Sequence, residues 1–234
     1  SILDTLGITT VLNLSYSGFR DPAELQAYED ALRQDIDKYP ERFRFASAFS
    51  VTHFQEPNYV SDVIAKLQRD VDQYHPVAVK IWKDLGMMLK DSGDHYVFCD
   101  DPRFTPIYDF IVSKGLAIYM HIADPLAGWL PLDTPSPHAN YFRNHPEFHW
   151  YGKPGKPSHE EILSHRDALV ARYPKTAFVA AHLASLEHDL AQVGEFLDTF
   201  PNARVDTAAR IRDLTLMPND VVKAFFIKYQ DRVL

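Results

Sequence analysis

The sequence predicts an α/β fold in which parallel strands and helices alternate to form a barrel. Short apolar segments alternate with amphipathic stretches along the whole chain. A passage from a helix end, through an aromatic residue and usually a proline, into a strand recurs at about 25 to 40 residues, the spacing of a βα unit. The length of 234 residues suits one barrel domain spanning 1–234, because such barrels run to about 200–250 residues.

Six segments are predicted to be strands, since they are short and rich in β-branched, aromatic or small apolar residues. They occupy residues 9–16, 43–51, 76–82, 116–122, 176–183 and 203–209. Their nearly continuous apolar character indicates a parallel sheet with both faces covered. A seventh strand is expected to begin at "DRVL" (231–234). We therefore expect the supplied sequence to contain most of a barrel and to be incomplete at both ends.

Helix starts can be read from capping residues. Asp21 followed by Pro22 predicts an N-cap and a first-turn proline. Ser158 with Glu161 matches a capping box. A further helix is expected in "SLEHDLAQVGEFLDTF", with Ser185 as its cap.

A long segment at 125–158 interrupts the repeat between two of the strands. It is rich in proline and histidine, and its aromatic residues include Trp129 and Tyr151. Disordered segments are poor in aromatic residues, so a packed loop is expected. We interpret it as a lid over the barrel mouth that shapes the substrate pocket. The alternative is a contact in a homo-oligomer, which exposed aromatic residues would also permit.

Composition excludes several function classes. The net charge of -8 and the absence of a Lys/Arg-rich stripe argue against a nucleic-acid partner. No apolar run approaches the roughly 18 residues needed to span a bilayer, so no membrane partner is expected. Cys99 is the sole cysteine, so no internal disulfide forms and the cellular compartment stays open. A small-molecule substrate is the expected partner of a soluble protein.

Two histidines end two successive strands of the repeat. His121 follows "AIYM" and His182 follows "FVAA". Parallel α/β folds carry their chemistry at the carboxyl ends of strands, and a pair of neutral imidazoles there can bind one zinc-like ion. The alternative for each is a hydrogen-bonded core histidine. Their matched placement favours the metal site.

Other charged residues also lie at strand ends. Lys80 interrupts the apolar strand "PVAVKIW", where a buried ammonium is costly unless it is paired. It is a candidate for catalysis, for contact with an anionic substrate or for carboxylation to a bridging ligand; the alternative is a salt bridge with Asp124 or Asp206. Asp206 itself either orients a histidine or caps the next turn.

Four residues are candidates for substrate binding. Arg210 would bind a carboxylate, with a surface ion pair as its alternative reading. The other three are aromatic. They are Trp82, Trp129 and Tyr151.

Six motifs resemble one known family. They are "VKIWKDLGM", "DDPRFTPIYDF", "YMHIADP", "FVAAHLASLEHDL", "VDTAARI" and "YQDRVL". Together they resemble the amidohydrolase-related branch of the amidohydrolase superfamily, which includes decarboxylase-like and lactonase-like members. The resemblance covers essentially the whole chain, from barrel strand 2 to the start of strand 8.

The resemblance implies a distorted (β/α)8 TIM barrel, of which strand 1 and most of strand 8 are not among these residues. It also implies one divalent ion, often zinc, although some relatives work without metal. His121 maps to the metal ligand of strand 5, and His182 to the strand 6 histidine that binds metal or acts in catalysis. The family's other ligands, a His-x-His pair on strand 1 and an Asp on strand 8, have no counterpart in the sequence.

Three functions follow from this resemblance. The first is a metal-dependent hydrolase of an amide, ester or lactone, in which His182 or a carboxylate moves protons. The second is a non-oxidative decarboxylase, in which the metal binds a substrate carboxylate and Lys80 assists. The third is a non-catalytic binding protein on the same scaffold.

Overall fold

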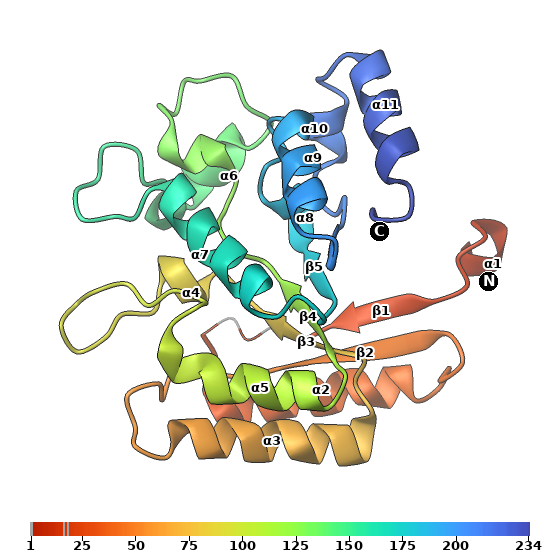
Figure 1. Cartoon of the computed structure of the whole chain (residues 1–234), viewed down its shortest axis with the longest axis vertical. Coiled ribbons are helices and arrows are strands. Elements are labelled where there is room, and N and C mark those ends of the chain that lie inside the picture. Colours follow the sequence, from red (N-terminus) through yellow and green to blue (C-terminus); the bar gives the residue numbers. More distant parts are fainter. Residues whose placement is uncertain (1, 16, 18) are drawn as a thin grey trace.

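The computed structural model describes residues 2–15, 17 and 19–234, and its centre is a curled parallel β-sheet (Figure 1). All six predicted strands form within the described residues, and the predicted residue 16 lies outside them. The strands are β1 (Val11–Leu14), β2 (Phe43–Ala48), β3 (Ala78–Ile81), β4 (Ala117–Met120), β5 (Phe178–Ala180) and β6 (Ala203–Val205). Their order in the sheet equals their order in the sequence, and each pairs in parallel with the next.

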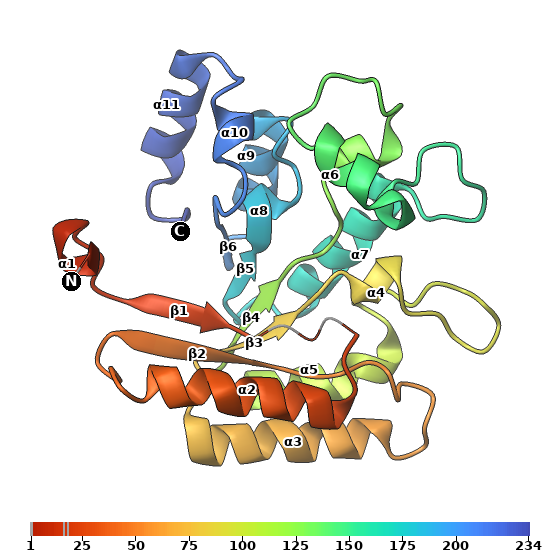
Figure 2. The same ribbon diagram turned by 180° about the vertical axis from the view of Figure 1, so that it is seen from behind.

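Helices connect successive strands and cover the outer side of the sheet, as the two opposite views in Figures 1 and 2 show. The described helices are α1 (Ile2–Thr5), α2 (Pro22–Ile36), α3 (Tyr59–Tyr74), α4 (Asp84–Met87), α5 (Thr105–Ser113), α6 (Ala139–Asn144), α7 (His159–Arg172), α8 (Ala181–Ala184), α9 (Leu190–Thr199), α10 (Ile211–Leu214) and α11 (Asn219–Tyr229). Parallel neighbours need such crossovers, and crossovers of one hand place every helix on the same side.

Two of the three predicted helix caps are confirmed. Asp21 caps α2 and Ser158 caps α7, each in a reciprocal capping box. The predicted cap at Ser185 was wrong: Asp189 is the N-cap of α9 and accepts a hydrogen bond from the main-chain N–H of Ala191, whereas Ser185 is the C-cap of α8. Ser185 lies instead in a left-handed turn that follows His182.

The expected seventh strand begins with one parallel β-bridge to β6. Val233 pairs in parallel with Val205 of β6, and the main-chain N–H of Leu234 donates to the carbonyl of Val205 at 2.8 Å. The sheet therefore continues past β6 in the same parallel sense.

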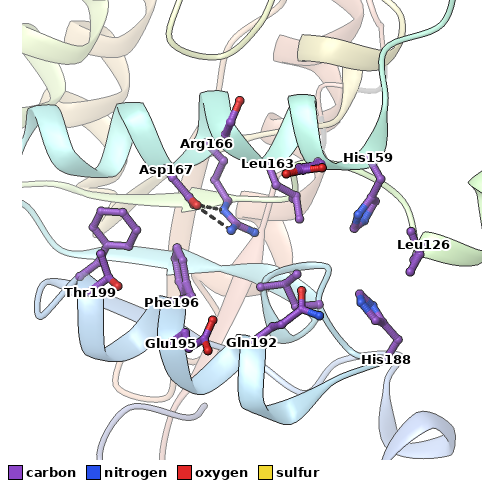
Figure 3. Close-up of a pocket in the computed structure, with 14 residues that line it drawn as sticks. Leu126, His159, Leu163, Arg166, Asp167, His188, Gln192, Glu195, Phe196 and Thr199 are labelled. Carbon is purple, nitrogen blue, oxygen red and sulfur yellow. Dashed lines mark hydrogen bonds and ion pairs between the residues drawn. The ribbon is translucent and has the colours of Figure 1, made fainter.

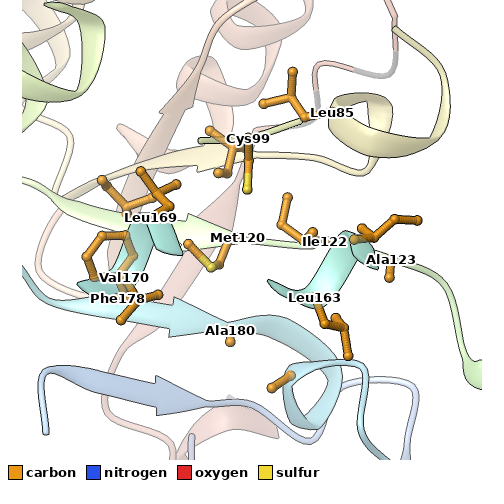
Figure 4. Packing of buried hydrophobic residues seen from close by; sticks show 14 of the residues in the cluster. Leu85, Cys99, Met120, Ile122, Ala123, Leu163, Leu169, Val170, Phe178 and Ala180 are labelled. Atoms are coloured by element: carbon orange, nitrogen blue, oxygen red, sulfur yellow. The ribbon is translucent and has the colours of Figure 1, made fainter. Parts of the chain in front are cut away.

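The two faces of the sheet carry hydrophobic clusters of different size. The main hydrophobic core lies between the outer face and the helices; Figure 4 shows Met120 and Phe178 from strands packed with Leu169 and Val170 of α7. A smaller apolar cluster lies on the inner face. It consists of Ala46, Ala78, Tyr119, Val179 and Ala181.

Strand alternation decides which polar side chains face the barrel interior. Side chains two residues apart in a strand share a face. Because Ala78 and Tyr119 face inward, Lys80 and His121 follow them on the inner face. Ala203 and Val205 belong to the outer core, so Asp206 also turns inward. The sheet thus gathers these polar residues at one end of its concave side.

The 125–158 segment contains helix α6 and two 3-10 turns, Leu126–Trp129 and Pro146–Phe148. Its aromatic side chains pack on one another; the rings of Trp129 and Trp150, for example, lie 5.5 Å apart. The segment is therefore packed, as its aromatic content predicted. In the described part of the chain, no helix is both long and apolar enough to cross a bilayer.

Candidate active site

The structure brings His121 and His182 together at the carboxyl ends of two adjacent strands. Their ring centroids lie 4.4 Å apart and the ring planes are nearly perpendicular, at 86°. His121 directly follows Met120, the last residue of β4, and His182 follows Ala180 of β5 by two residues. The pairing of β4 with β5 thus sets two imidazoles against one small volume.

His121 is held as a neutral imidazole. Its side chain is 15% exposed, and its Nε2 atom is buried without a hydrogen-bond partner in the described part of the chain. Burial lowers its pKa well below the usual value of a histidine, and the neighbouring His182 and the cationic Lys80 lower it further. An unpartnered, uncharged imidazole nitrogen is the form that binds a metal ion.

His182 is oriented through its other ring nitrogen. Nδ1–H donates to the carbonyl of Ala208 at 2.7 Å, which leaves Nε2 with a free lone pair. Burial, followed by the field of Arg210, lowers its pKa to about 4. Its main-chain N–H donates to Asp206 at 2.7 Å. Asp206 also accepts from the N–H of Ala208 at 3.0 Å, so it positions the histidine and caps the following turn.

The backbone that carries His182 is left-handed. Residues 182 to 185 have φ values of 61°, 55°, 60° and 56°. Non-glycine residues rarely enter this region, which costs about 1–2 kcal/mol for each residue in a left-handed helix. Surrounding contacts must therefore hold the turn in place.

Lys80 is a buried cation beside the two histidines. It is 7% exposed, and its ammonium lies 4.7 Å from the ring centroid of Tyr119. Among the described residues Lys80 forms no direct salt bridge: Asp124 binds Lys83, and Asp206 accepts a hydrogen bond from the Tyr119 hydroxyl. The charge of Asp206 nevertheless raises the Lys80 pKa. Burial lowers the pKa of Lys80 to about 8.

Lys83 is an important residue that the sequence reasoning missed. Its ammonium donates to both oxygens of Asp124 at 2.6 and 2.7 Å, with both side chains 4% exposed. It also contacts the 125–158 segment, at 3.2 Å from the Tyr141 hydroxyl and 3.7 Å from the Phe148 ring centroid. The sequence did contain a signal for this residue, because two charged residues, Lys83 and Asp84, follow the predicted strand. The sequence does not show which of the two side chains turns inward.

Arg210 forms a buried ion pair, so the predicted surface pair was wrong. It is 5% exposed, and its Nε lies 3.1 Å from an oxygen of Glu187, which is 2% exposed. Its charge lowers the pKa of His182 and of His121. Arg210 therefore acts on the imidazole pair through its field.

The aromatic candidates separate into two groups. The Trp82 ring lies 6.3 Å from the His121 ring, nearly perpendicular to it. Trp129 instead packs against Trp150 and His159, and its Nε1–H donates to the carbonyl of Pro157 at 2.9 Å. Tyr151 is 52% exposed, with its ring 6.4 Å from that of His149. The structure thus places only Trp82 of these three beside the imidazoles.

The imidazole pair fits a metal ion as two of its ligands. The evidence is the orphaned Nε2 of His121 beside the lone pair of His182. Among the described residues there is no group of three or more His, Cys, Asp or Glu side chains able to hold an ion. Two imidazoles leave at least two positions of a tetrahedral ion for other ligands.

A large cavity lies away from this site. It measures about 630 Å³ and is lined by side chains of α7 and α9, with His159 and His188 facing each other at one end in Figure 3. Arg166 and Asp167 form an ion pair farther along it. Neither His121 nor His182 lines this cavity.

Comparison with solved structures identifies the fold. The 2,6-dihydroxybenzoate decarboxylase of Rhizobium is 19% identical with a TM-score of 0.62, covering 100% of this chain and 74% of that one. A dihydroxybenzoic acid decarboxylase of Polaromonas, solved with manganese and the inhibitor 2-nitroresorcinol, is 18% identical with a TM-score of 0.61, covering 100% and 72%. The 4-oxalomesaconate hydratase of Rhodopseudomonas palustris is 17% identical with a TM-score of 0.60, covering 100% and 63%.

At these identities the likeness concerns the fold, a TIM barrel to which the six-stranded sheet of the described residues corresponds. No curated protein matches the sequence. A sequence model described as amidohydrolase matches residues 19–234, nearly the whole chain. The resemblance predicted from the motifs is confirmed, and the chain belongs to the amidohydrolase family of enzymes.

Proposed function

We propose that this protein is a metal-dependent decarboxylase of a small carboxylate-bearing substrate. The observation that carries the proposal is the buried ammonium of Lys80, which has no direct salt bridge in the described part of the chain and faces the same end of the barrel as the two imidazoles. The charge of Asp206 offsets only part of the cost of burying this cation, because burial still lowers the Lys80 pKa. An anionic substrate would supply a direct partner. The structural neighbours that act on carboxylated phenols support the same substrate class.

The chemistry assigns a role to each residue. His121 and His182 would hold a divalent ion through their Nε2 atoms; when bound, this ion supplies Lewis-acid charge and orients substrate oxygens. Lys80 would hold the substrate carboxylate, and the half-buried Trp82 would form a wall against an aromatic ring. Decarboxylation breaks the bond between carbon and the carboxylate, releases carbon dioxide and places a proton on that carbon. Solvent water would supply that proton, while Lys80 keeps its charge and holds the carboxylate.

Hydrolysis of an amide, ester or lactone is the second candidate. It is favoured by the neutral state of His182, whose Nδ1–H is engaged by the Ala208 carbonyl so that Nε2 is left as a proton acceptor. The same scaffold and the same two imidazoles serve either reaction. The two candidates differ in the bond that breaks.

Product analysis separates the two reactions. The chain is loaded with Mn²⁺ or Zn²⁺ and incubated with a panel of hydroxybenzoates and, in parallel, with a panel of lactones, esters and anilides. We expect the protein to release carbon dioxide from the hydroxybenzoates, and we expect a chelator to stop this release. Acid release from the second panel without carbon dioxide from the first would replace the decarboxylase by the hydrolase. Inactivity with both panels, together with metal binding, would favour the non-catalytic binding protein.

The role of Lys80 predicts a particular pH dependence. Only the protonated ammonium binds an anion, so kcat/KM should fall as the pH rises through about 8, where the buried Lys80 loses its proton. A bound divalent cation lowers this pKa further, which moves the fall to lower pH. A hydrogen bond to a charged group contributes about 1.5–3 kcal/mol. Its loss in Lys80→Met should therefore raise KM by roughly 10- to 150-fold.

Lys80→Arg is the matched control, because its guanidinium stays charged throughout this pH range. The fall of kcat/KM near pH 8 should disappear in this variant, and substrate affinity should be partly kept. An unchanged KM in Lys80→Met would contradict the proposed contact with the substrate.

We also propose that the 125–158 segment is a lid over this site. Its contacts with Lys83, through Tyr141 and Phe148, support this assignment. They attach the segment to Lys83, two residues beyond the end of β3 at the carboxyl end of the barrel strands.

A further inference from the structure

We infer that Ser185 is a positioning residue that sets the separation of the two imidazoles and thereby the metal affinity of the site. The inference rests on the proposed metal-binding role of His121 and His182. Ser185 is neither of these ligands and acts through its contact with the loop after His121. Ser185 itself is completely buried and does not contact the proposed ion.

The Ser185 hydroxyl joins the two loops that carry the imidazoles. Its Oγ lies 2.8 Å from the carbonyl oxygen of Ile122 and 3.0 Å from that of Ala123. Both carbonyls belong to the loop directly after His121, whereas Ser185 lies three residues after His182. One hydroxyl proton, shared between two carbonyls, therefore ties the end of β4 to the end of β5.

Both loops have backbones that need such support. Residues 182 to 185 form a left-handed turn without glycine, and Ala123 in the facing loop also has a positive φ of 67°. Non-glycine residues keep this conformation only where surrounding contacts fix it. The Ser185 hydroxyl is a side-chain hydrogen bond that connects the two strained segments directly; the His159 side chain also interacts with the main chain of both Asp124 and Ser185.

Two further contacts hold the turn without reaching the loop of His121. The Arg166 guanidinium of α7 donates to the carbonyl of Ala184, and the main-chain N–H of Leu183 donates to the carbonyl of Asp206 at 2.7 Å. Arg166 approaches from the outer helix layer, and Asp206 belongs to the β6 side. Ser185 alone of these three reaches the loop of His121, so its removal should change the imidazole separation while the turn itself persists.

The test compares metal binding by the purified chain and by Ser185→Ala. Each is stripped with a chelator and titrated calorimetrically with Mn²⁺ or Co²⁺ alone, and the absorption spectrum of bound Co²⁺ is recorded. Loss of a hydrogen-bond partner of a metal ligand typically costs about 10–100-fold in affinity. Ser185 acts through the main chain next to His121, so we expect Kd to rise by about 10-fold, the lower end of that range. We also expect the Co²⁺ spectrum to change, because the angle between the two imidazoles changes.

Ser47→Ala is the matched control. Ser47 on β2 is as fully buried as Ser185, and its hydroxyl donates to Asp70 in a separate network with Lys66. This variant should lose stability yet keep the Kd and the Co²⁺ spectrum of the native chain. A second variant, Ala184→Gly, relieves strain in the left-handed turn and keeps the Ser185 hydroxyl, so it should also keep the native Kd.

The outcomes distinguish this inference from the proposed function. Tight binding by the native chain and an equal Kd and spectrum in Ser185→Ala would overturn the role of Ser185 while leaving the metal site intact. Absence of binding by the native chain would overturn the metal site itself, and with it the role given to Ser185. An equal rise in Kd for Ser185→Ala and Ser47→Ala would mean that general destabilisation weakens metal binding, and this result would also reject the inference.

Discussion

Replacement of His121 by alanine is expected to abolish metal binding and turnover together. The variant removes one of two imidazoles whose rings lie 4.4 Å apart, and the remaining histidine cannot hold a divalent ion alone. Loss of an outer-shell partner already costs about 10–100-fold in metal affinity. We therefore expect a fall of more than 100-fold in both affinity and kcat/KM, measured by elemental analysis of the dialysed protein and by initial rates.

His95→Ala is the control for this prediction. The His95 side chain is 80% exposed, so its removal should change neither metal content nor turnover. Retention of full metal content and full rate by His121→Ala would reject the metal site at the imidazole pair. Retained metal with lost activity would restrict His121 to a catalytic role.

Breaking the ion pair between Lys83 and Asp124 is expected to produce the largest loss of stability. Both side chains are 4% exposed, and the ammonium lies 2.6 Å from a carboxylate oxygen. Lys83→Met leaves the Asp124 carboxylate buried without its partner, which typically costs about 3–5 kcal/mol. The free energy of unfolding, measured by urea denaturation, should fall by this amount, and contacts of the 125–158 segment with Lys83 should loosen.

The double variant Lys83→Met/Asp124→Leu tests the physical cause. If the loss arises from an uncompensated buried charge, removing the second charge should restore most of the stability. An exposed pair gives the baseline: Lys228 and Asp198 are 61% and 57% exposed, so Lys228→Met should change the free energy of unfolding by less than about 1 kcal/mol. An equally small effect of Lys83→Met would indicate that water reaches the pair at Asp124.

The fold was largely predictable because each element carries a local signal. Apolar runs marked all six strands, and the capping boxes at Asp21 and Ser158 marked two helix starts. The prediction at Ser185 failed because a serine before an acidic, apolar stretch also matches an N-cap. Residues 182 to 185 instead form a left-handed turn, which is fixed by contacts with distant segments.

The candidate site was predictable only in part. His121 and His182 stood out because both end apolar strands, and Lys80 stood out because it interrupts an apolar strand. The partners of the charged residues did not follow from sequence. Lys83 lies one residue from Trp82 and three from Lys80, yet it is Lys83 that binds Asp124, 41 positions away.

The sequence by itself determined the strands, their parallel order and the two histidines at the strand ends, because periodicity and capping act over a few residues. Only the tertiary structure decided which charges pair, which aromatic residues reach the imidazoles and that Ser185 joins two loops. These features depend on hydrogen bonds between segments distant in the chain, such as Ser185 with Ile122. Their geometry is fixed only when the sheet curls and brings the ends of β4 and β5 together.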